Sequence, residues 1–162
     1  MKSFTKLKKI TSIIVFGLSV LFFIILVLSK NKLNEFASQA IKLETGSIVK
    51  KEMQQQVDSL YNYAVNEIQY EITFLEFGAK GCSACKRMET VMDKVRNKYP
   101  NKVNLVFMNI LKPESQDLMK YYGIAAIPTQ ILLNKDGKEY FRHTGYFSLK
   151  ELTNKIIIKD QN

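Results

Sequence analysis

The sequence predicts an α/β domain with a mixed central sheet of four to five strands flanked by helices, preceded by one transmembrane helix. Three observations support this prediction: an uncharged apolar segment near the N-terminus, helical and strand-like periods that alternate beyond residue 47, and an Asp-Gly pair between two short apolar runs. A chain of 162 residues has room for one ordinary domain and an appendage. We therefore expect a basic cytoplasmic N-terminus over residues 1–9, a transmembrane anchor over 10–29, a linker over 30–46 and the folded domain over 47–162.

The segment over residues 10–29 is long enough to cross a membrane. It carries no charged residue, and at about 1.5 Å per residue a helix of this length spans a hydrocarbon core of roughly 30 Å. Four lysines precede it and only two follow closely, so the positive-inside rule places the N-terminus in the cytoplasm and the domain outside. A cleaved signal peptide is the alternative, but its apolar core would be shorter and its cleavage site nearer than the weak candidate Ser38-Gln39-Ala40.

The net charge of +9 is concentrated at the N-terminus. Residues 1–33 hold six lysines and no acidic residue, which leaves an excess of three positive charges for the rest of the chain. Recognition of phosphate backbones needs a concentrated basic face. We therefore expect no nucleic-acid partner.

The first half of the domain predicts helices and strands in alternation. Apolar residues recur every three to four positions in the helical stretches, and the strands are continuous apolar runs, as in strands buried on both faces. Pro100 stops one helix, and Gly123 can close another through a positive-φ cap. In chain order we expect a helix over residues 53–68, a strand over 72–77, a helix over 85–99, a strand over 103–108 and a short helix over 113–123.

The second half predicts a hairpin and a terminal helix. Residues 130–133 and 138–143 flank a loop that ends in Asp136-Gly137, and an Asp-Gly pair marks a tight turn between antiparallel strands. Ser148 and Glu151 form an S-x-x-E capping box ahead of an apolar helical stripe. The sheet should therefore have a parallel half and an antiparallel half, covered by helices.

Cys82 and Cys85 lie three positions apart between the strand over 72–77 and the helix that follows it. If that helix begins at Cys82, unpaired backbone N–H groups and the helix dipole stabilise its thiolate, which makes Cys82 the candidate nucleophile. Cys85 shares a helical stripe with apolar residues, so its sulfur should point inward, close enough to Cys82 to displace a mixed disulfide. Lys80, Lys86 and Arg87 add positive charge nearby, or are only solvated.

Three other interpretations of the cysteine pair remain open. Zinc needs four ligands, and the chain offers two cysteines and one histidine, so a closed site would need carboxylates or a second chain. A purely structural disulfide would close a very short loop and contribute little stability. Two inert buried thiols are the third interpretation, although core packing does not call for cysteines at a helix start. The placement of the pair favours redox chemistry.

Two motifs in the sequence resemble the thioredoxin superfamily. They are residues 74–86, which run through both cysteines, and residues 122–129, which contain Pro128. The resemblance covers about residues 47–158 and implies a thioredoxin-like fold in which a cis proline lies opposite the cysteine helix. It implies that Pro128 is cis and that Ile127 offers backbone hydrogen bonds to a substrate segment. The candidate substrate-binding residues are Ile127, Pro128 and Gly81; a trans proline that begins a strand is the alternative for Pro128.

Glu76 stands six residues before Cys82, where thioredoxins carry a buried acid that exchanges a proton with the resolving cysteine. Burial would raise the pKa of this carboxyl toward neutrality, so that it could deprotonate Cys85. The alternative is an exposed glutamate on an edge strand. The sequence departs from the common thioredoxin pattern at Gly81, where tryptophan is usual, and at Ser83-Ala84, where Gly-Pro is usual; both changes bear on the redox potential.

The resemblance is to bacterial exported or membrane-anchored members of the superfamily. It implies a membrane-anchored thiol-disulfide oxidoreductase with no bound cofactor and no metal, facing the outside of the cell membrane. Its partners would be disulfide-containing extracytoplasmic client proteins and a membrane electron donor of the thiol-disulfide interchange type. Ile127 before Pro128, and the lack of room for a helical insertion, favour reduction. A disulfide-donating oxidase and a non-catalytic docking module are the alternatives, and His143 is expected to be an ordinary surface or half-buried histidine.

Overall fold

The structure, a computed structural model of the chain, describes residues 2–158 and divides into two compact units, with the division between Phe36 and Ala37. Met1 and residues 159–162, which belong to the predicted N-terminus and the predicted domain, lie outside the described residues. The first unit is the greater part of the helix α1 (Lys2–Glu44). From Thr11 on, α1 is long and apolar enough to cross a membrane, and its apolar side chains are exposed, which is compatible with a single-pass anchor or with a signal sequence.

The second unit is built on a four-stranded mixed sheet in the order β2-β1-β3-β4. The strands are β1 (Ile72–Gly78), β2 (Val103–Asn109), β3 (Thr129–Leu133) and β4 (Glu139–Thr144). β1 pairs parallel with β2 and antiparallel with β3, and β3 pairs antiparallel with β4. The predicted mixed sheet is therefore confirmed, with four strands. All seven residues of β1 are buried, because apolar cores lie on both faces of this strand, which explains why it is a nearly continuous apolar run.

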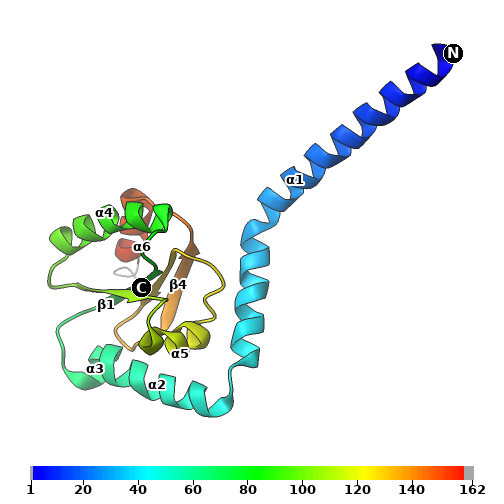
Figure 1. Cartoon of the computed structure of the whole chain (residues 1–162). Coiled ribbons are helices and arrows are strands. Elements are labelled where there is room, and N and C mark those ends of the chain that lie inside the picture. Colours follow the sequence, from blue (N-terminus) through cyan, green and yellow to red (C-terminus); the bar gives the residue numbers. More distant parts are fainter. Residues whose placement is uncertain (1, 159–162) are drawn as a thin grey trace. The chain divides into compact units, whose positions relative to one another are not determined.

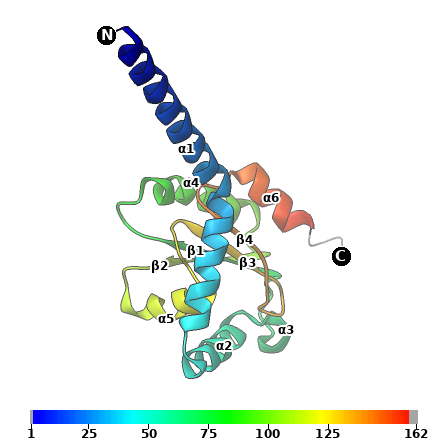
Figure 2. The same cartoon turned by 90° about the vertical axis from the view of Figure 1, so that its right-hand side faces the viewer.

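Helices cover both faces of the sheet (Figure 1). α4 (Ser83–Lys98) and α6 (Leu149–Ile158) lie on one side, and α2 (Ser47–Tyr61), α3 (Tyr63–Asn66) and α5 (Pro113–Tyr122) lie on the other, as the view turned by 90° also shows (Figure 2). Alternate residues of β1 point to opposite faces of the sheet and pack in two separate hydrophobic cores. Ile72 and Phe74 pack with α4 and α6, whereas Leu75 and Phe77 pack with α2 and α5.

The segment over residues 30–46, where we expected a tether, is helical as far as Glu44. Its end belongs to the packing of the second unit, because Ser38 and Thr45 are buried. Arg142 Nη1 donates a hydrogen bond to Ser38 Oγ at 2.7 Å, and Thr45 Oγ1 donates one to the carbonyl of Lys120 at 3.3 Å. Two of the polar residues that suggested a linker, Ser38 and Thr45, thus make hydrogen bonds within the second unit. The domain boundaries themselves stay a prediction.

The helix predicted over residues 53–68 is interrupted. α2 ends at Tyr61, where Asn62 leaves the helical conformation, and a single turn follows as α3. Val57 and Tyr61 are buried as the helical stripe predicted, but Leu60, within α2, and Ile68 are exposed. Ile68 leaves the stripe because the helix ends before it. The backbone N–H of Tyr63 instead donates to the carbonyl of Lys135 at 2.8 Å, which ties this turn to the β3–β4 hairpin.

Candidate redox site

Cys82 and Cys85 form a disulfide at the N-terminus of α4. Cys82 is the N-cap residue, and its Sγ accepts a hydrogen bond from the backbone N–H of Cys85 at 3.1 Å. Cys82 is half-buried, whereas Cys85 is only 2% exposed, and their Cα atoms are 5.2 Å apart. The sulfur that meets solvent therefore lies where unpaired N–H groups and the helix dipole stabilise negative charge, and its neighbour points into the core.

The turn between β1 and α4 brings the cysteines to the end of the sheet. Gly78 ends β1, and its carbonyl accepts a hydrogen bond from Ile110 N at 2.9 Å. A Cβ at Gly78 would lie 2.9 Å from the ring of Phe107, so that ring would have to shift, and it would be in van der Waals contact with Cys85 Sγ at 3.4 Å. Gly81 has φ +87° and open space around it, so the residue before Cys82 leaves the sulfur accessible.

The Ile127–Pro128 peptide bond is cis, as expected. Thr129, the next residue, pairs with Phe77 in the sheet, so Pro128 stands at the end of β1 from which the cysteine turn departs. The Pro128 carbonyl accepts a hydrogen bond from Gly145 N at 2.7 Å, which holds the loop in place. Within the described part of the chain, Ile127 makes no backbone hydrogen bond, so its N–H and carbonyl are open to an extended segment.

Glu76 lies on the inner strand β1 and is 0% exposed, so the edge-strand alternative is wrong. Burial raises the pKa of its carboxyl to about 8, and the hydrogen bond from Gln130 opposes that rise. Because successive side chains of a strand alternate, Glu76 points to the same face as Phe74 and Gly78, which is the face that α4 covers. Gly78 is the position on this face that lies next to Cys85 Sγ. Glu76 is two residues away from it, which is about 7 Å along the strand.

Gln130 is a buried polar residue at this site that sequence reasoning missed. It is 0% exposed, it is the β3 partner of Glu76, and its Nε2 donates a hydrogen bond to Glu76 Oε1 at 3.3 Å. The signal in the sequence was a glutamine inside the apolar run that follows Pro128. Buried amides need a partner, so this residue could have been matched to the buried acid once the strand order was known.

The remaining candidates lie at the rim. His143 is half-buried, as expected, and its ring stacks on Phe147 with centroids 4.4 Å apart. Arg87 places its guanidinium carbon 5.1 Å from the centroid of the Tyr146 ring. Lys80 and Lys86 are exposed. These side chains give the surface next to the cysteines a positive and aromatic border.

A family model for a thioredoxin-like domain matches residues 45–157, well over half of the chain. This chain belongs to the thioredoxin-like family. The resemblance inferred from the cysteine and proline motifs is thereby confirmed, and so is the predicted fold. The matched residues include the disulfide at the start of α4 and the cis proline.

Curated relatives match part of the thioredoxin-like domain. The thioredoxin-like protein HCF164 of the chloroplast of Oryza sativa subsp. japonica is 30% identical over 88 residues, which are 50% of this chain and 34% of that protein. A thioredoxin of Borreliella burgdorferi is 28% identical over 64 residues, which are 40% of this chain and 53% of that protein. This chain thus spans about a third to a half of the length of these relatives.

Solved thioredoxin structures share the fold. Thioredoxin NaTrxh of Nicotiana alata is 28% identical and superposes with a TM-score of 0.52, covering 67% of this chain and 84% of that one. Oxidised thioredoxin O2 of Arabidopsis thaliana is 18% identical, with a TM-score of 0.51 and coverage of 67% and 87%. The second likeness concerns the fold alone.

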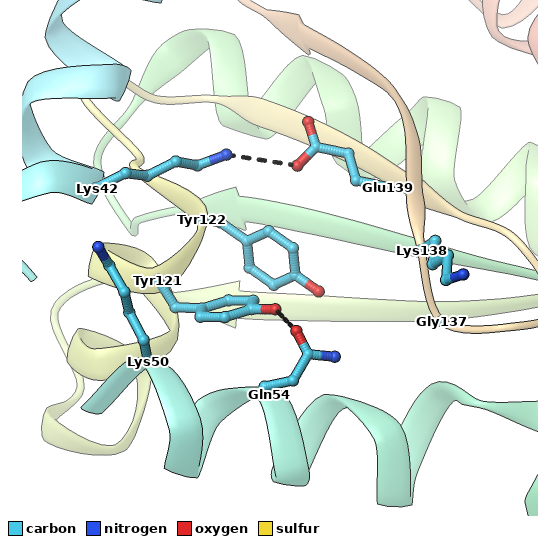
Figure 3. Close-up of a pocket in the computed structure, with 8 residues that line it drawn as sticks. All are labelled: Lys42, Lys50, Gln54, Tyr121, Tyr122, Gly137, Lys138 and Glu139. Atoms are coloured by element: carbon cyan, nitrogen blue, oxygen red, sulfur yellow. Dashed lines mark hydrogen bonds and ion pairs between the residues drawn. The ribbon is translucent and has the colours of Figure 1, made fainter. Parts of the chain in front are cut away.

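The thioredoxin-like domain also has a pocket of about 540 Å³ at the hairpin end of the sheet (Figure 3). Glu139, in its wall, pairs with Leu133, which lies at the end of β3 opposite Pro128. Figure 3 shows Tyr122 in the middle of the lining and the hydrogen bond from Tyr121 to Gln54 below it. This pocket is separate from the redox site. The lining residues are Lys42, Lys50, Gln54, Tyr121, Tyr122, Gly137, Lys138 and Glu139.

Proposed function

We propose that this chain is a membrane-anchored thiol-disulfide oxidoreductase that reduces disulfides of extracytoplasmic proteins through Cys82 and Cys85. The observation that supports this most directly is the arrangement of the two sulfurs. Cys82 caps α4 at the surface, where its Sγ accepts a hydrogen bond from the backbone N–H of Cys85. The side chain of Cys85 is buried behind it. An accessible, stabilised thiolate next to a shielded thiol is what stepwise exchange with a target disulfide requires.

The proposed cycle begins with both cysteines reduced. The Cys82 thiolate attacks one sulfur of the target disulfide, a mixed disulfide forms, and the other target sulfur leaves as a thiolate. Cys85 then gives its thiol proton to the Glu76 carboxylate and attacks Cys82 Sγ, so that the second target thiolate leaves and the Cys82–Cys85 disulfide closes. Two electrons have passed to the target. A membrane electron donor of the thiol-disulfide interchange type would return the pair to the dithiol.

The target would bind beside the cis proline. Ile127 has an unpaired backbone N–H and carbonyl within the described residues, and Gly81 leaves open space in front of Cys82. An extended client segment could pair with Ile127 as an added strand and present its disulfide to Cys82. Such pairing uses backbone atoms, so it suits clients of many sequences.

The proposed location is supported by the apolar part of α1. The apolar segment would anchor the chain in the cell membrane, with the four leading lysines in the cytoplasm and the domain outside. A maleimide that cannot cross membranes tests this in intact cells after mild reduction. Labelling of Cys82 without permeabilisation is expected, and labelling only after permeabilisation would contradict the proposed orientation.

The experiment that tests the function is a measurement of the reduction potential of the pair. The full chain in detergent is equilibrated in thiol buffers, with Cys82→Ser as the control. A potential near roughly −270 mV supports a reductase, whereas one near roughly −120 mV would make the protein a disulfide donor. If no reversible couple appears in any buffer, the redox proposal fails and a non-catalytic docking role replaces it.

A further inference from the structure

Glu76 and Gln130 form an isolated polar pair inside the sheet. They face each other across β1 and β3, both are 0% exposed, and Gln130 Nε2 lies 3.3 Å from Glu76 Oε1. Each side chain has one oxygen left over. Among the described residues, neither Glu76 Oε2 nor Gln130 Oε1 has a hydrogen-bond partner. A buried polar atom without a partner is costly, so this arrangement calls for a functional or chemical reason.

The groups around the pair narrow its possible chemistry. On β2, the residue opposite Glu76 is Phe107, and the neighbouring positions on the same face of β1 and β3 are apolar. On this face of the sheet, Cys85 Sγ on α4 lies near Gly78, two positions from Glu76, and His143 is the β4 partner of Gln130. α6 adds Glu151 near His143, and this carboxylate is bound by Ser148. Once the disulfide is reduced, the Cys85 thiol is therefore the buried group that can supply a proton on this face.

A glutamine can serve Glu76 in both of its protonation states. When Glu76 is ionised, the amide N–H donates to one of its oxygens, which is the bond present in the structure. When Glu76 is protonated, its O–H can donate to Gln130 Oε1, the oxygen that now lacks a partner. The two leftover oxygens are thus the donor and acceptor sites of a second bond that forms only when the acid carries a proton. An apolar residue at position 130 would provide neither bond.

We propose that Gln130 is a positioning residue that holds the Glu76 carboxyl and governs its exchange of a proton with Cys85. This inference rests on the proposed function. In the step concerned, the proton of the Cys85 thiol moves to Glu76, the Cys85–Cys82 bond forms, and the bond from Cys82 to the target sulfur breaks with the electron pair leaving on that sulfur. Gln130 neither gives nor takes a proton. It makes one hydrogen bond to Glu76 when the carboxyl is ionised and a second one when the carboxyl is protonated.

The test isolates the attack of Cys85. The reduced full chain in detergent is mixed with Ellman's reagent, which first forms a mixed disulfide on Cys82; release of the second thionitrobenzoate then reports the closure of the Cys82–Cys85 disulfide. We expect Gln130→Met to move the pH midpoint of this second phase upward by about one unit, because the hydrogen bond from Gln130 lowers the pKa of Glu76 and a charge-assisted bond to the carboxylate outweighs the neutral bonds that the acid loses. Below that midpoint the second phase should slow about tenfold, while the first phase is unchanged.

Two further variants distinguish a positioning role of Gln130 from a role in core packing alone. In Glu76→Gln no carboxyl is left to titrate, so adding Gln130→Met should leave the pH profile where it was. His143→Gln, the matched control at the neighbouring titratable group, should leave the midpoint of the wild-type profile in place. If Gln130→Met slows the second phase equally at every pH, or shifts the profile in the Glu76→Gln background as well, Gln130 only fills the core and the proposal is overturned.

A measurement on the unaltered protein covers the case in which Gln130→Met does not fold. The side-chain amide resonances of Gln130 should shift with pH at the same midpoint as the Glu76 carboxyl carbon, because the bonding of the amide changes with that proton. Amide signals that stay constant through the titration of Glu76 would overturn the proposal. Failure of the proposed function looks different: wild type would then release only one thionitrobenzoate without closing the disulfide, whatever Gln130 does.

Discussion

The carboxyl group of Glu76 has no exposed surface, and burial raises its pKa from 4.5 in the unfolded chain to about 8. Between these two pH values the folded state holds a proton that the unfolded state has released. Stability should therefore fall as the pH rises from about 4.5 toward 8, by on the order of 1.4 kcal/mol per pH unit. We expect Glu76→Gln to flatten this dependence, as measured by urea unfolding of the oxidised protein at several pH values.

The control for this prediction is Glu89→Gln on the exposed side of α4, which should retain the wild-type slope. A Glu76→Gln protein that loses stability with pH as steeply as wild type would show that another group carries the dependence. The sequence could identify Glu76 as a candidate, because it is the one charge in an apolar run. It could not predict Gln130 as its partner, because that contact depends on the pairing of β1 with β3.

The two cysteines should behave differently when one is removed. In Cys85→Ser the half-buried Cys82 can still attack a target but nothing resolves the product, so a mixed disulfide should accumulate. In Cys82→Ser the remaining sulfur is 2% exposed and should form almost no adduct. Mass spectrometry after incubation with an oxidised model protein measures both. Comparable adducts on the two variants would mean that the order of attack is wrong.

At the scale of elements, the C-terminus of α5 meets the end of α1 through a glycine. Gly123 has φ +64°, and a Cβ there would overlap the carbonyl oxygen of Ser38 and lie 2.8 Å from Lys42 Cγ. Gly123→Ala should therefore cost about 1–3 kcal/mol of stability, from backbone strain and from the displaced contact. Thermal unfolding measures this loss. Gly46→Ala is the control, because φ at Gly46 is −58° and its Cβ would meet nothing within 4 Å, and an equal loss in both variants would contradict the packing argument.

Elements with local signals were predicted well. The Asp-Gly turn has Gly137 at φ +72°, and the capping box is present, with Glu151 N donating to Ser148 Oγ at 3.3 Å and Ser148 N donating to Glu151 Oε2 at 3.2 Å. Each of these features depends on residues within four positions of one another. The break at Tyr61–Asn62 had no comparable signal, since the bond from Tyr63 to Lys135 spans more than seventy residues.

At the scale of the whole molecule, the second compact unit includes the last turns of α1. Arg142 on β4 donates hydrogen bonds to Ser38 Oγ, to the Tyr122 carbonyl and to the carboxylate of Glu139 on the same strand, with N–O distances of 2.6–2.8 Å. A soluble piece that begins at residue 37 retains this network, whereas one that begins at residue 46 leaves Arg142 without Ser38. We expect the longer piece to be more stable by about 1–3 kcal/mol, since a charged group loses a partly buried partner.

Urea unfolding of the two pieces measures this difference. Arg142→Met is the matched control, because it should remove most of the advantage of the longer piece. Equal stability of the two wild-type pieces would mean that residues 37–45 contribute nothing to the domain.

The sequence by itself determined the long apolar segment near the N-terminus, the order of strands and helices in the second unit, the cysteine pair at a helix start and the proline that turned out to be cis. These features are legible because each depends on hydrophobic period, on turn chemistry or on a short motif. The tertiary structure alone decided that β1 is an inner strand, that Gln130 meets Glu76, and that the end of α1 packs on α5 and β4. Those facts depend on contacts between residues distant in sequence, whose free energy is set by which surfaces are buried together and not by any local pattern.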